Sequence, residues 1–470
     1  MNSTKNNKQL FVVPTQEESH LVANVSRDSS FIGMTKSHKI ISVKYEADWY
    51  GMFKKSFYIF LILISFSAKA NFILLPMDES TQKNHLKAYG ITYWALDKQF
   101  KASWLLNYRG GSFLLPNVPE IRKECQIRGV SFEVLSDGEM QSILADISSP
   151  SQNMETVVLE KAPKIAVYSP PGKQPWDDAV TMVLTYAEIP FKVVYDEEVL
   201  GDQLLLYDWL HLHHEDFTGQ YGKFYGAYRN APWYIEQKKD AEALATKLGF
   251  AKVSQDKLAV AKKIRDFVIG GGFMFAMCSA TDSFDIALAS EGIDICEPMF
   301  DGDDSEPNYQ SKIDYSKTFA FKNFILDRKP EHYEFSDIDM TEKRRIPFEK
   351  DYFTLMEFSA KWDVIPSMLC QNHTQLVKGF MGQTTSFDSE LIKSNVLTLG
   401  KNELNDEARY IHGQKGKGFF TFFGGHDPED YQHRVGDEPT VLDLHPNSPG
   451  FRLILNNVLF PAARKKPQKT

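Results

Sequence analysis

The chain has 470 residues, with 53 lysines and arginines against 62 aspartates and glutamates, which gives a formal net charge of −9. At about 150 residues per domain, this length predicts two or three domains. Hydrophobic residues make up 43% and charged residues 24% of the chain, a balance that excludes a wholly disordered protein. The acidic excess argues against electrostatic binding of nucleic acid, because neutralising phosphates needs a surplus of lysine and arginine.

Residues 52–70 have the pattern of a secretory signal peptide. Lys54 and Lys55 precede an almost unbroken apolar run over residues 57–66, and an Ala-Lys-Ala end follows it. The run is about half as long as the ~20 residues that cross a bilayer. The alternative is an apolar helix or strand of the core. We predict export to the periplasm or the medium, with cleavage before Asn71 and no stable membrane insertion afterwards.

The position of this segment is unusual, because a signal peptide should begin near the first residue. Residues 1–51 show no clear helical or strand period. We interpret Met52 as the start of translation and residues 1–51 as a non-native or disordered extension. The alternative is a genuine N-terminal tail followed by an uncleaved anchor.

All the cysteines follow the predicted cleavage site, in a compartment that permits disulfides. Four cysteines in so long a chain are too sparse for a disulfide scaffold. They form no C-x-x-C pair, which argues against a zinc ribbon or a thioredoxin motif. They are Cys125, Cys278, Cys296 and Cys370.

Residues 71–150 predict a small α/β domain. Gly90 and Gly129 are interpreted as the ends of its two helices. A stretch rich in serine, 147–157, predicts a linker after it. The predicted elements are a strand over 72–75, a helix over 80–89, strands over 91–96 and 103–107, a helix over 118–128 and a strand over 130–135.

Residues 160–462 predict a larger domain in which strands alternate with helices. Such alternation implies right-handed crossovers and a doubly wound, mostly parallel sheet, with functional sites at the carboxyl ends of the strands. A mixed or β-rich insertion is expected at about 300–400, with strands over 318–324 and 352–358. The other predicted strands cover 165–168, 191–195, 208–213, 273–277 and 418–423, and the predicted helices cover 176–187, 256–269 and 448–459.

Cys278 ends the apolar strand 273–277 and has Ala276 and Ala280 two residues away on either side. A nucleophile placed on a sharp turn between a strand and a helix needs such small neighbours. The N-terminus of a following helix, over about 282–290, would lower the pKa of the thiol. The alternative is a buried cysteine that packs in the core.

His426 follows the apolar strand 418–423, with Asp427 and Glu429 just after it. A histidine in a loop after a strand, oriented by a carboxylate, is suited to act as a general base. The alternative is a loop histidine in an Asp-Pro turn.

The order Cys278, His426, Glu429, together with the Gly-Gly-His-Asp run that ends at Asp427 and the closing segment 451–457, resembles the class I glutamine-amidotransferase-like superfamily and its ThuA-like branch. The resemblance covers about residues 163–300 and 415–462. It implies a flavodoxin-like, doubly wound fold. Glu429 stands three residues after His426, whereas in the family the glutamate stands two residues after the histidine.

This resemblance implies a cysteine-dependent amide or acyl hydrolase or transferase. Cys278 would attack the acyl carbon, and His426 would take and return the proton, oriented by Glu429 or Asp427. Backbone N–H groups near Gly219, Gly222 and Ser279 would hold the oxyanion. Many members of the superfamily have lost this triad.

His211 and His213 alternate along the strand 208–213 and therefore share a face, with Glu215 following. The three residues are a candidate metal site, or His213 and Glu215 border the active site. The alternative is a polar strand end with partly satisfied histidines. No metal-binding motif such as H-E-x-x-H supports a metal, and no other cofactor is expected.

The whole chain also resembles bacterial proteins labelled asparagine synthetase B. That chemistry needs a glycine-rich S-G-G-x-D-S loop, because glycines let the backbone wrap a pyrophosphate. Residues 279–283, Ser-Ala-Thr-Asp-Ser, lack both glycines. Two hypotheses therefore come first: an exported cysteine-dependent enzyme, and a non-catalytic protein that binds a small molecule or carbohydrate in the crevice at the strand ends.

Overall fold

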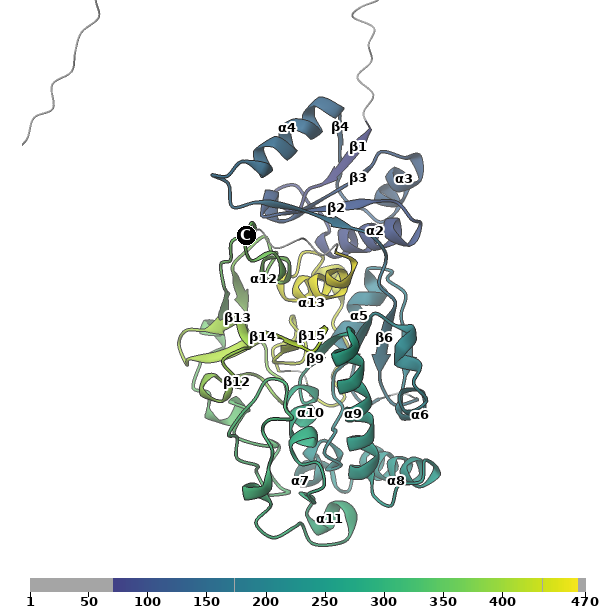
Figure 1. The fold of residues 1–470 in the computed structure, drawn as a ribbon, viewed down its shortest axis with the longest axis vertical. Helices are drawn as coiled ribbons and strands as arrows, with labels where there is room; N and C mark the ends of the chain where they lie inside the picture. Colours follow the sequence, from purple (N-terminus) through teal and green to yellow (C-terminus); the bar gives the residue numbers. More distant parts are fainter. Residues whose placement is uncertain (1–70, 173, 433, 464–470) are drawn as a thin grey trace, which may run out of the picture. The chain divides into compact units, whose positions relative to one another are not determined.

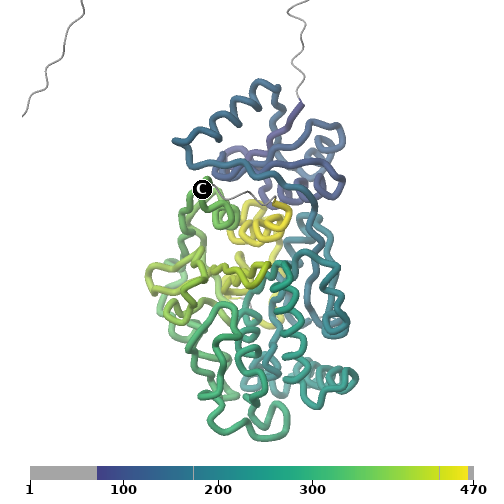
Figure 2. Tube along the Cα trace, in the orientation of Figure 1, coloured from purple at the N-terminus to yellow at the C-terminus, as the bar shows by residue number. Residues whose placement is uncertain are grey.

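The computed structural model describes residues 71–172, 174–432 and 434–463, which all belong to one unit of the chain, Ala68–Thr470. The predicted extension at 1–51 and the predicted signal peptide at 52–70 lie outside these residues. Two β-sheets with their helices make the chain a mixed α/β protein (Figure 1; Figure 2). Among the described helices, none is long and apolar enough to span a membrane.

The first sheet has five antiparallel strands in the order β4-β1-β3-β2-β5. Leu74, Leu105 and Leu114 bury one of its faces in a small core with α4. The elements are β1 (Phe72–Leu75), α2 (His85–Asp97), β2 (Ala102–Leu106), β3 (Ser112–Pro116), α3 (Pro119–Ile127), β4 (Glu133–Leu135), α4 (Asp137–Ser148) and β5 (Glu155–Leu159).

Three predictions for this region are wrong. The helix predicted at 80–89 and the strand predicted at 91–96 are replaced by the single helix α2, which contains Gly90. Gly90 serves close packing, because a Cβ there would lie 1.9 Å from the carbonyl oxygen of Ala187. The linker predicted at 147–157 holds the end of α4 and the start of β5, so the first sheet extends to residue 159.

The second sheet has ten strands, with the order β11-β10-β13-β14-β15-β9-β8-β6-β7 and β12 beside β14. The five strands predicted at 165–168, 191–195, 208–213, 273–277 and 418–423 are confirmed, and they form its parallel half. The strands are β6 (Ile165–Tyr168), β7 (Lys192–Val194), β8 (Trp209–Leu212), β9 (Phe273–Met277), β10 (Tyr352–Leu355), β11 (Leu376–Lys378), β12 (Phe387–Asp388), β13 (Leu397–Asn402), β14 (Glu407–Lys415) and β15 (Gly418–Phe423).

In the other half of the sheet, the strands from β10 to β15 pair with their neighbours in antiparallel fashion. The prediction of a mostly parallel sheet therefore holds for one half only. The physical reason is the insertion, whose strands extend the sheet beyond β15. The strand predicted at 318–324 is reduced to a single bridge between Phe321 and Ile392, and the one predicted at 352–358 ends at Leu355.

Helices cover both faces of the parallel half. Alternate side chains of β9 point to opposite faces, so Phe275 packs in a core with α5 and α13, and Ala276 packs in a core with α6, α9 and α10. The helices are α5 (Ala179–Tyr186), α6 (Asp196–Leu200), α7 (Tyr225–Tyr228), α8 (Pro232–Lys247), α9 (Val253–Gly270), α10 (Ala280–Ala289), α11 (Pro298–Asp301), α12 (Val364–Leu369) and α13 (Pro449–Leu459).

Candidate functional site

Three adjacent parallel strands bring the predicted site residues to one edge of the sheet. Ala276 of β9 pairs with Leu212 of β8 on one side and with Phe422 of β15 on the other. The residues that follow these strands therefore meet at their carboxyl ends, as parallel pairing requires. They include Cys278, His213, His214 and His426.

Cys278 occupies a strained turn between β9 and α10. Its φ of 52° lies in the left-handed region, which a side chain with a Cβ adopts at a cost. The side chain is 3% exposed, and the backbone N–H of Gln383, from the insertion, donates to its Sγ at 3.3 Å. The insertion thus covers the thiol.

Burial raises the pKa of the Cys278 thiol to about 11. The backbone N–H groups of Gln383, Thr384 and Ser279 act in the opposite direction, but desolvation outweighs them. The backbone N–H of Ser279, at the start of α10, thus lowers this pKa as expected, but a buried thiolate loses more hydration than the nearby N–H groups replace, so the net shift is upward.

His426 is held by a residue that the sequence analysis did not assign to the site. Its Nε2 lies 3.3 Å from Oδ1 of Asp177, in the loop before α5. Glu429 instead contacts His445, with Oε2 at 3.1 Å from Nδ1. Asp427 accepts the backbone N–H of Glu429 at 2.8 Å, and burial raises its pKa to about 6.

His211 and His213 share a face, as the alternation of the strand predicts. Oδ2 of Asp178 lies 3.0 Å from Nε2 of His211 and 3.1 Å from Nδ1 of His213. Burial acts to raise the pKa of the Asp178 carboxyl, but the two histidines outweigh it and hold that pKa well below its usual range. Glu215, the third predicted ligand, lies in a cavity next to this group.

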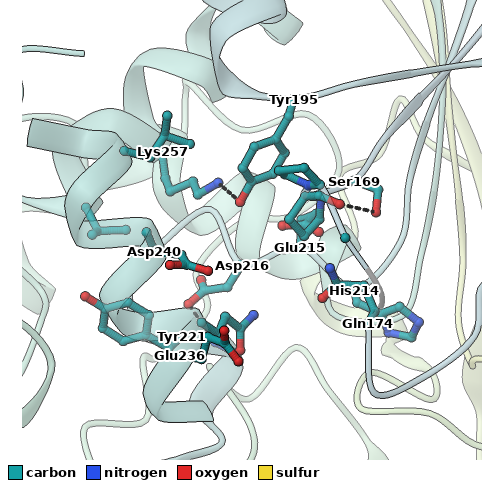
Figure 3. A pocket seen from close by; sticks show the side chains of 18 of the residues that line it. Ser169, Gln174, Tyr195, His214, Glu215, Asp216, Tyr221, Glu236, Asp240 and Lys257 are labelled. Atoms are coloured by element: carbon teal, nitrogen blue, oxygen red, sulfur yellow. Dashed lines mark hydrogen bonds between the residues drawn. The ribbon is translucent and has the colours of Figure 1, made fainter. Parts of the chain in front are cut away.

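The cavity has a volume of about 830 Å³ and opens at the carboxyl ends of β6, β7 and β8 (Figure 3). Three predicted site residues line it, Glu215, Gly219 and Gly222. Their neighbours His214 and Asp216, which the sequence analysis did not assign to the site, line it as well. Cys278 and His426 are not among the lining residues. The predicted nucleophile and base therefore do not line the cavity, although the ring centroid of His426 lies 4.4 Å from that of His214, which does.

The two predicted oxyanion glycines build the loop after β8. The N–H of Gly222 donates to Oδ2 of Asp216 at 3.0 Å, and its carbonyl accepts from Nε2 of Gln383 at 2.6 Å. Gly219 has a φ of 84°, and a Cβ there would lie 2.7 Å from the backbone of Ser254. The N–H of Gly222 is thus already engaged within the chain. The backbone N–H of Ser279, the third predicted donor, lowers the pKa of Cys278.

A buried ion pair that the sequence analysis missed lies at the cavity wall. Nζ of Lys257, from α9, is 3.0 Å from Oδ2 of Asp196. It also lies 2.9 Å from the hydroxyl of Tyr195, as Figure 3 shows. It fixes the end of β7 against α9. Asp196 and Lys257 are 61 residues apart, and no local pattern links them.

Burial raises the pKa of Glu215 to about 7. Coulombic attraction from Lys257 lowers that pKa, but desolvation is the larger effect. A carboxyl group that titrates near neutrality inside a cavity is able both to accept and to donate a proton. Glu215 is therefore the residue of the cavity best suited to acid–base work.

Comparisons with known proteins find no matching family model and no matching curated protein. Among solved structures, two cytoplasmic proteins from Salmonella typhimurium are similar to 64% of this chain over 100% of their own length. Their sequence identities are 10% and 13%, and the TM-scores are 0.32 and 0.33. Similarity at this level carries no argument about fold or function.

Proposed function

We propose that this chain binds a small, uncharged, hydroxyl-rich molecule, of the carbohydrate class, in the cavity at the carboxyl ends of β6, β7 and β8. The observation that carries the proposal is the cavity itself. Its volume of about 830 Å³ lies in the range of ligand pockets, and it stands where parallel α/β sheets bind their ligands.

The order of the parallel strands supports a glutamine-amidotransferase-like fold. We number the parallel strands 1 to 5 in chain order, as β6, β7, β8, β9 and β15. In the sheet they lie side by side in the order 2-1-3-4-5, which is the flavodoxin-like order. The turn at Cys278 and the loop at His426 follow the fourth and fifth of these strands. We propose on this basis that the parallel half of the sheet is of that type.

The walls of the cavity suit a hydroxyl-rich ligand. Carboxylates accept hydrogen bonds from hydroxyl groups, and aromatic side chains offer apolar faces against which a ring can pack. The cavity combines both, since Asp240 and Glu236 of α8 stand opposite Tyr195, with Trp233 and Phe224 also lining it. Figure 3 shows Asp240, Glu236 and Tyr195 around the same space.

The charges of the walls disfavour an anionic ligand. Among the described residues that line the cavity, six have carboxyl side chains, at residues 197, 198, 215, 216, 236 and 240, against two lysines. Lys247 is paired with Glu197, and Lys257 is paired with Asp196. The lysines are thus already neutralised, and a carboxylate or phosphate ligand would meet uncompensated negative charge.

We expect neutral mono- and disaccharides to bind the full chain, and sugar phosphates and uronic acids to bind more weakly. Isothermal titration of the full chain against such a panel measures this directly. Asp240→Ala should weaken binding by at least about tenfold, because a hydrogen bond to a charged group contributes about 1.5–3 kcal/mol. Glu242→Ala is the matched control, since Glu242 is on the same helix and does not line this cavity. Equal losses in both variants, or a preference for the anions, would refute the proposal.

A second candidate function is the cysteine-dependent hydrolysis that the resemblance implies. The left-handed φ of Cys278, at a turn from a strand into a helix, favours it. The raised pKa of the thiol and the absence of Cys278 from the cavity lining weigh against it. The two functions differ in the reactivity that they require of this thiol.

A further inference from the structure

Three histidines, two after β8 and one after β15, form a cluster beside the cavity. His213 and His214 follow β8, and His426 follows β15. One ring nitrogen from each lies within 4.8 Å of one from each of the others. Their ring centroids are 3.8 to 4.8 Å apart.

We propose that His213, His214 and His426 bind one divalent transition-metal ion, of the zinc class. Three imidazole nitrogens are a common ligand set for such ions, whereas magnesium and calcium prefer oxygen ligands. This set differs from the one predicted from the sequence, because His426 replaces Glu215 and His214 replaces His211. The proposal does not depend on the carbohydrate ligand.

Asp177 orients two of the three rings. Its backbone carbonyl oxygen accepts from Nε2 of His214 at 3.0 Å, and its Oδ1 lies 3.3 Å from Nε2 of His426. Metal-binding histidines typically donate one ring N–H to a carbonyl or carboxylate, which fixes the tautomer and directs the other nitrogen to the ion. A single residue supplies both contacts here.

His213 provides an independent observation. Its side chain is 2% exposed, and its Nε2 makes no hydrogen bond to the residues that the structure describes. Its Nδ1 faces Oδ2 of Asp178 at 3.1 Å. Burying a ring nitrogen without a hydrogen bond is costly, and an ion bound by Nε2 would compensate for that cost.

Binding requires a small rearrangement. The rings of His213 and His214 are stacked with an angle of 11° between their planes, so the lone pairs of their ring nitrogens lie in nearly parallel planes. One ring must turn to direct its nitrogen to a shared ion. His214 lines the cavity, where Figure 3 shows it beside Glu215, so its ring has room to turn, and its hydrogen bond to the carbonyl oxygen of Asp177 must adjust with it. The cavity also leaves room for a further ligand on the ion, such as water.

Two other clusters of metal-ligand types are weaker candidates. The first consists of Asp178, His211 and His213, in which Oδ2 of Asp178 already contacts both histidines. In the second, Asp294 and Asp301 lie beside Cys296, but the ammonium of Lys252 pairs with both carboxylates. A cation of the protein thus already occupies the position that a metal would take.

The test is zinc binding by the full chain, with any affinity tag removed. The protein is stripped with a chelator, incubated with Zn²⁺ and dialysed, and bound zinc is measured by elemental analysis and by competition with a chromophoric chelator. We expect one zinc ion per chain. His214→Gln and His426→Gln should each weaken binding by more than about 100-fold, since the loss of an outer-shell partner alone costs 10–100-fold. Asp177→Asn should weaken zinc binding by about 10–100-fold, as expected for an outer-shell partner.

Two variants serve as controls. His332→Gln changes a histidine outside the cluster, which pairs with Asp327, and Cys296→Ser changes the cysteine of the alternative cluster. Both should bind zinc like the unmodified chain, and circular dichroism checks that each variant is folded. The proposal is overturned if the folded chain retains no zinc, if zinc binding survives in both histidine variants, or if Cys296→Ser abolishes it.

Discussion

We expect Arg344→Met to lower the free energy of unfolding by about 3–5 kcal/mol, because it breaks a buried ion-pair network from one side. Nε of Arg344 lies 2.7 Å from Oε1 of Glu407, and its Nη2 lies 2.7 Å from Oδ1 of Asp351. The three side chains are at most 5% exposed. Without the guanidinium, two carboxylates would stay buried without a countercharge. The network joins the insertion to the start of β14.

Urea unfolding followed by tryptophan fluorescence measures this loss. Adding Glu407→Gln to Arg344→Met should restore part of the stability, since it removes one of the two uncompensated charges. Lys401→Met is the surface control, because Lys401 pairs with the largely exposed Asp406, and it should cost no more than about 1 kcal/mol. A similar small cost for Arg344→Met would show that the network contributes little.

We expect Gly382→Ala to disturb the segment of the insertion that covers the site. A Cβ at Gly382 would lie 2.8 Å from the carbonyl carbon of Gly425 and from the backbone nitrogen of His426. Both neighbours are backbone atoms of a buried loop, so the segment itself must move. Overpacking of this kind costs about 1–3 kcal/mol.

The same movement should expose Cys278. Residues 381–384 hold the site by three hydrogen bonds. The carbonyl oxygens of Met381 and Thr384 accept from the backbone N–H groups of His426 and Gly425, and the N–H of Gln383 donates to the thiol of Cys278. Gly382→Ala should therefore both destabilise the chain and speed the alkylation of Cys278. Gly138→Ala is the control, because nothing lies within 4 Å of a Cβ there. An unchanged alkylation rate in a destabilised Gly382→Ala would mean that this segment does not protect the thiol.

The sequence predicted the parallel half of the second sheet well. Its strands are short apolar runs between turn residues and helices, as in residues 273–277, and buried parallel strands have this local pattern. Since the carboxyl ends of such strands meet, the sequence also predicted that Cys278, His213 and His426 come together. The antiparallel half was predicted only as a mixed or β-rich insertion. Its strands β11 and β12, with three and two residues, are too short for a local pattern and are defined by their partners.

The partners of the site residues were beyond the reach of local patterns. Asp177 stands in no motif that the sequence analysis identified, yet it contacts His426, 249 residues away. Gly90 looked like a helix end, because only the distant Ala187 shows why it must be small. The pKa of Cys278 depends on the insertion that covers it, which local sequence around the cysteine does not contain.

The central claim is that the cavity, and not thiol chemistry, carries the function. The most direct test is the rate at which iodoacetamide alkylates Cys278 in the folded full chain near neutral pH, located by peptide mass mapping. A pKa of about 11 instead of 9.0 lowers the thiolate fraction by about 100-fold, and burial restricts access further. We expect labelling at least about 100-fold slower than that of the unfolded chain, with no change in His426→Gln. Rapid labelling that slows in His426→Gln would instead demonstrate an activated thiolate and contradict this account.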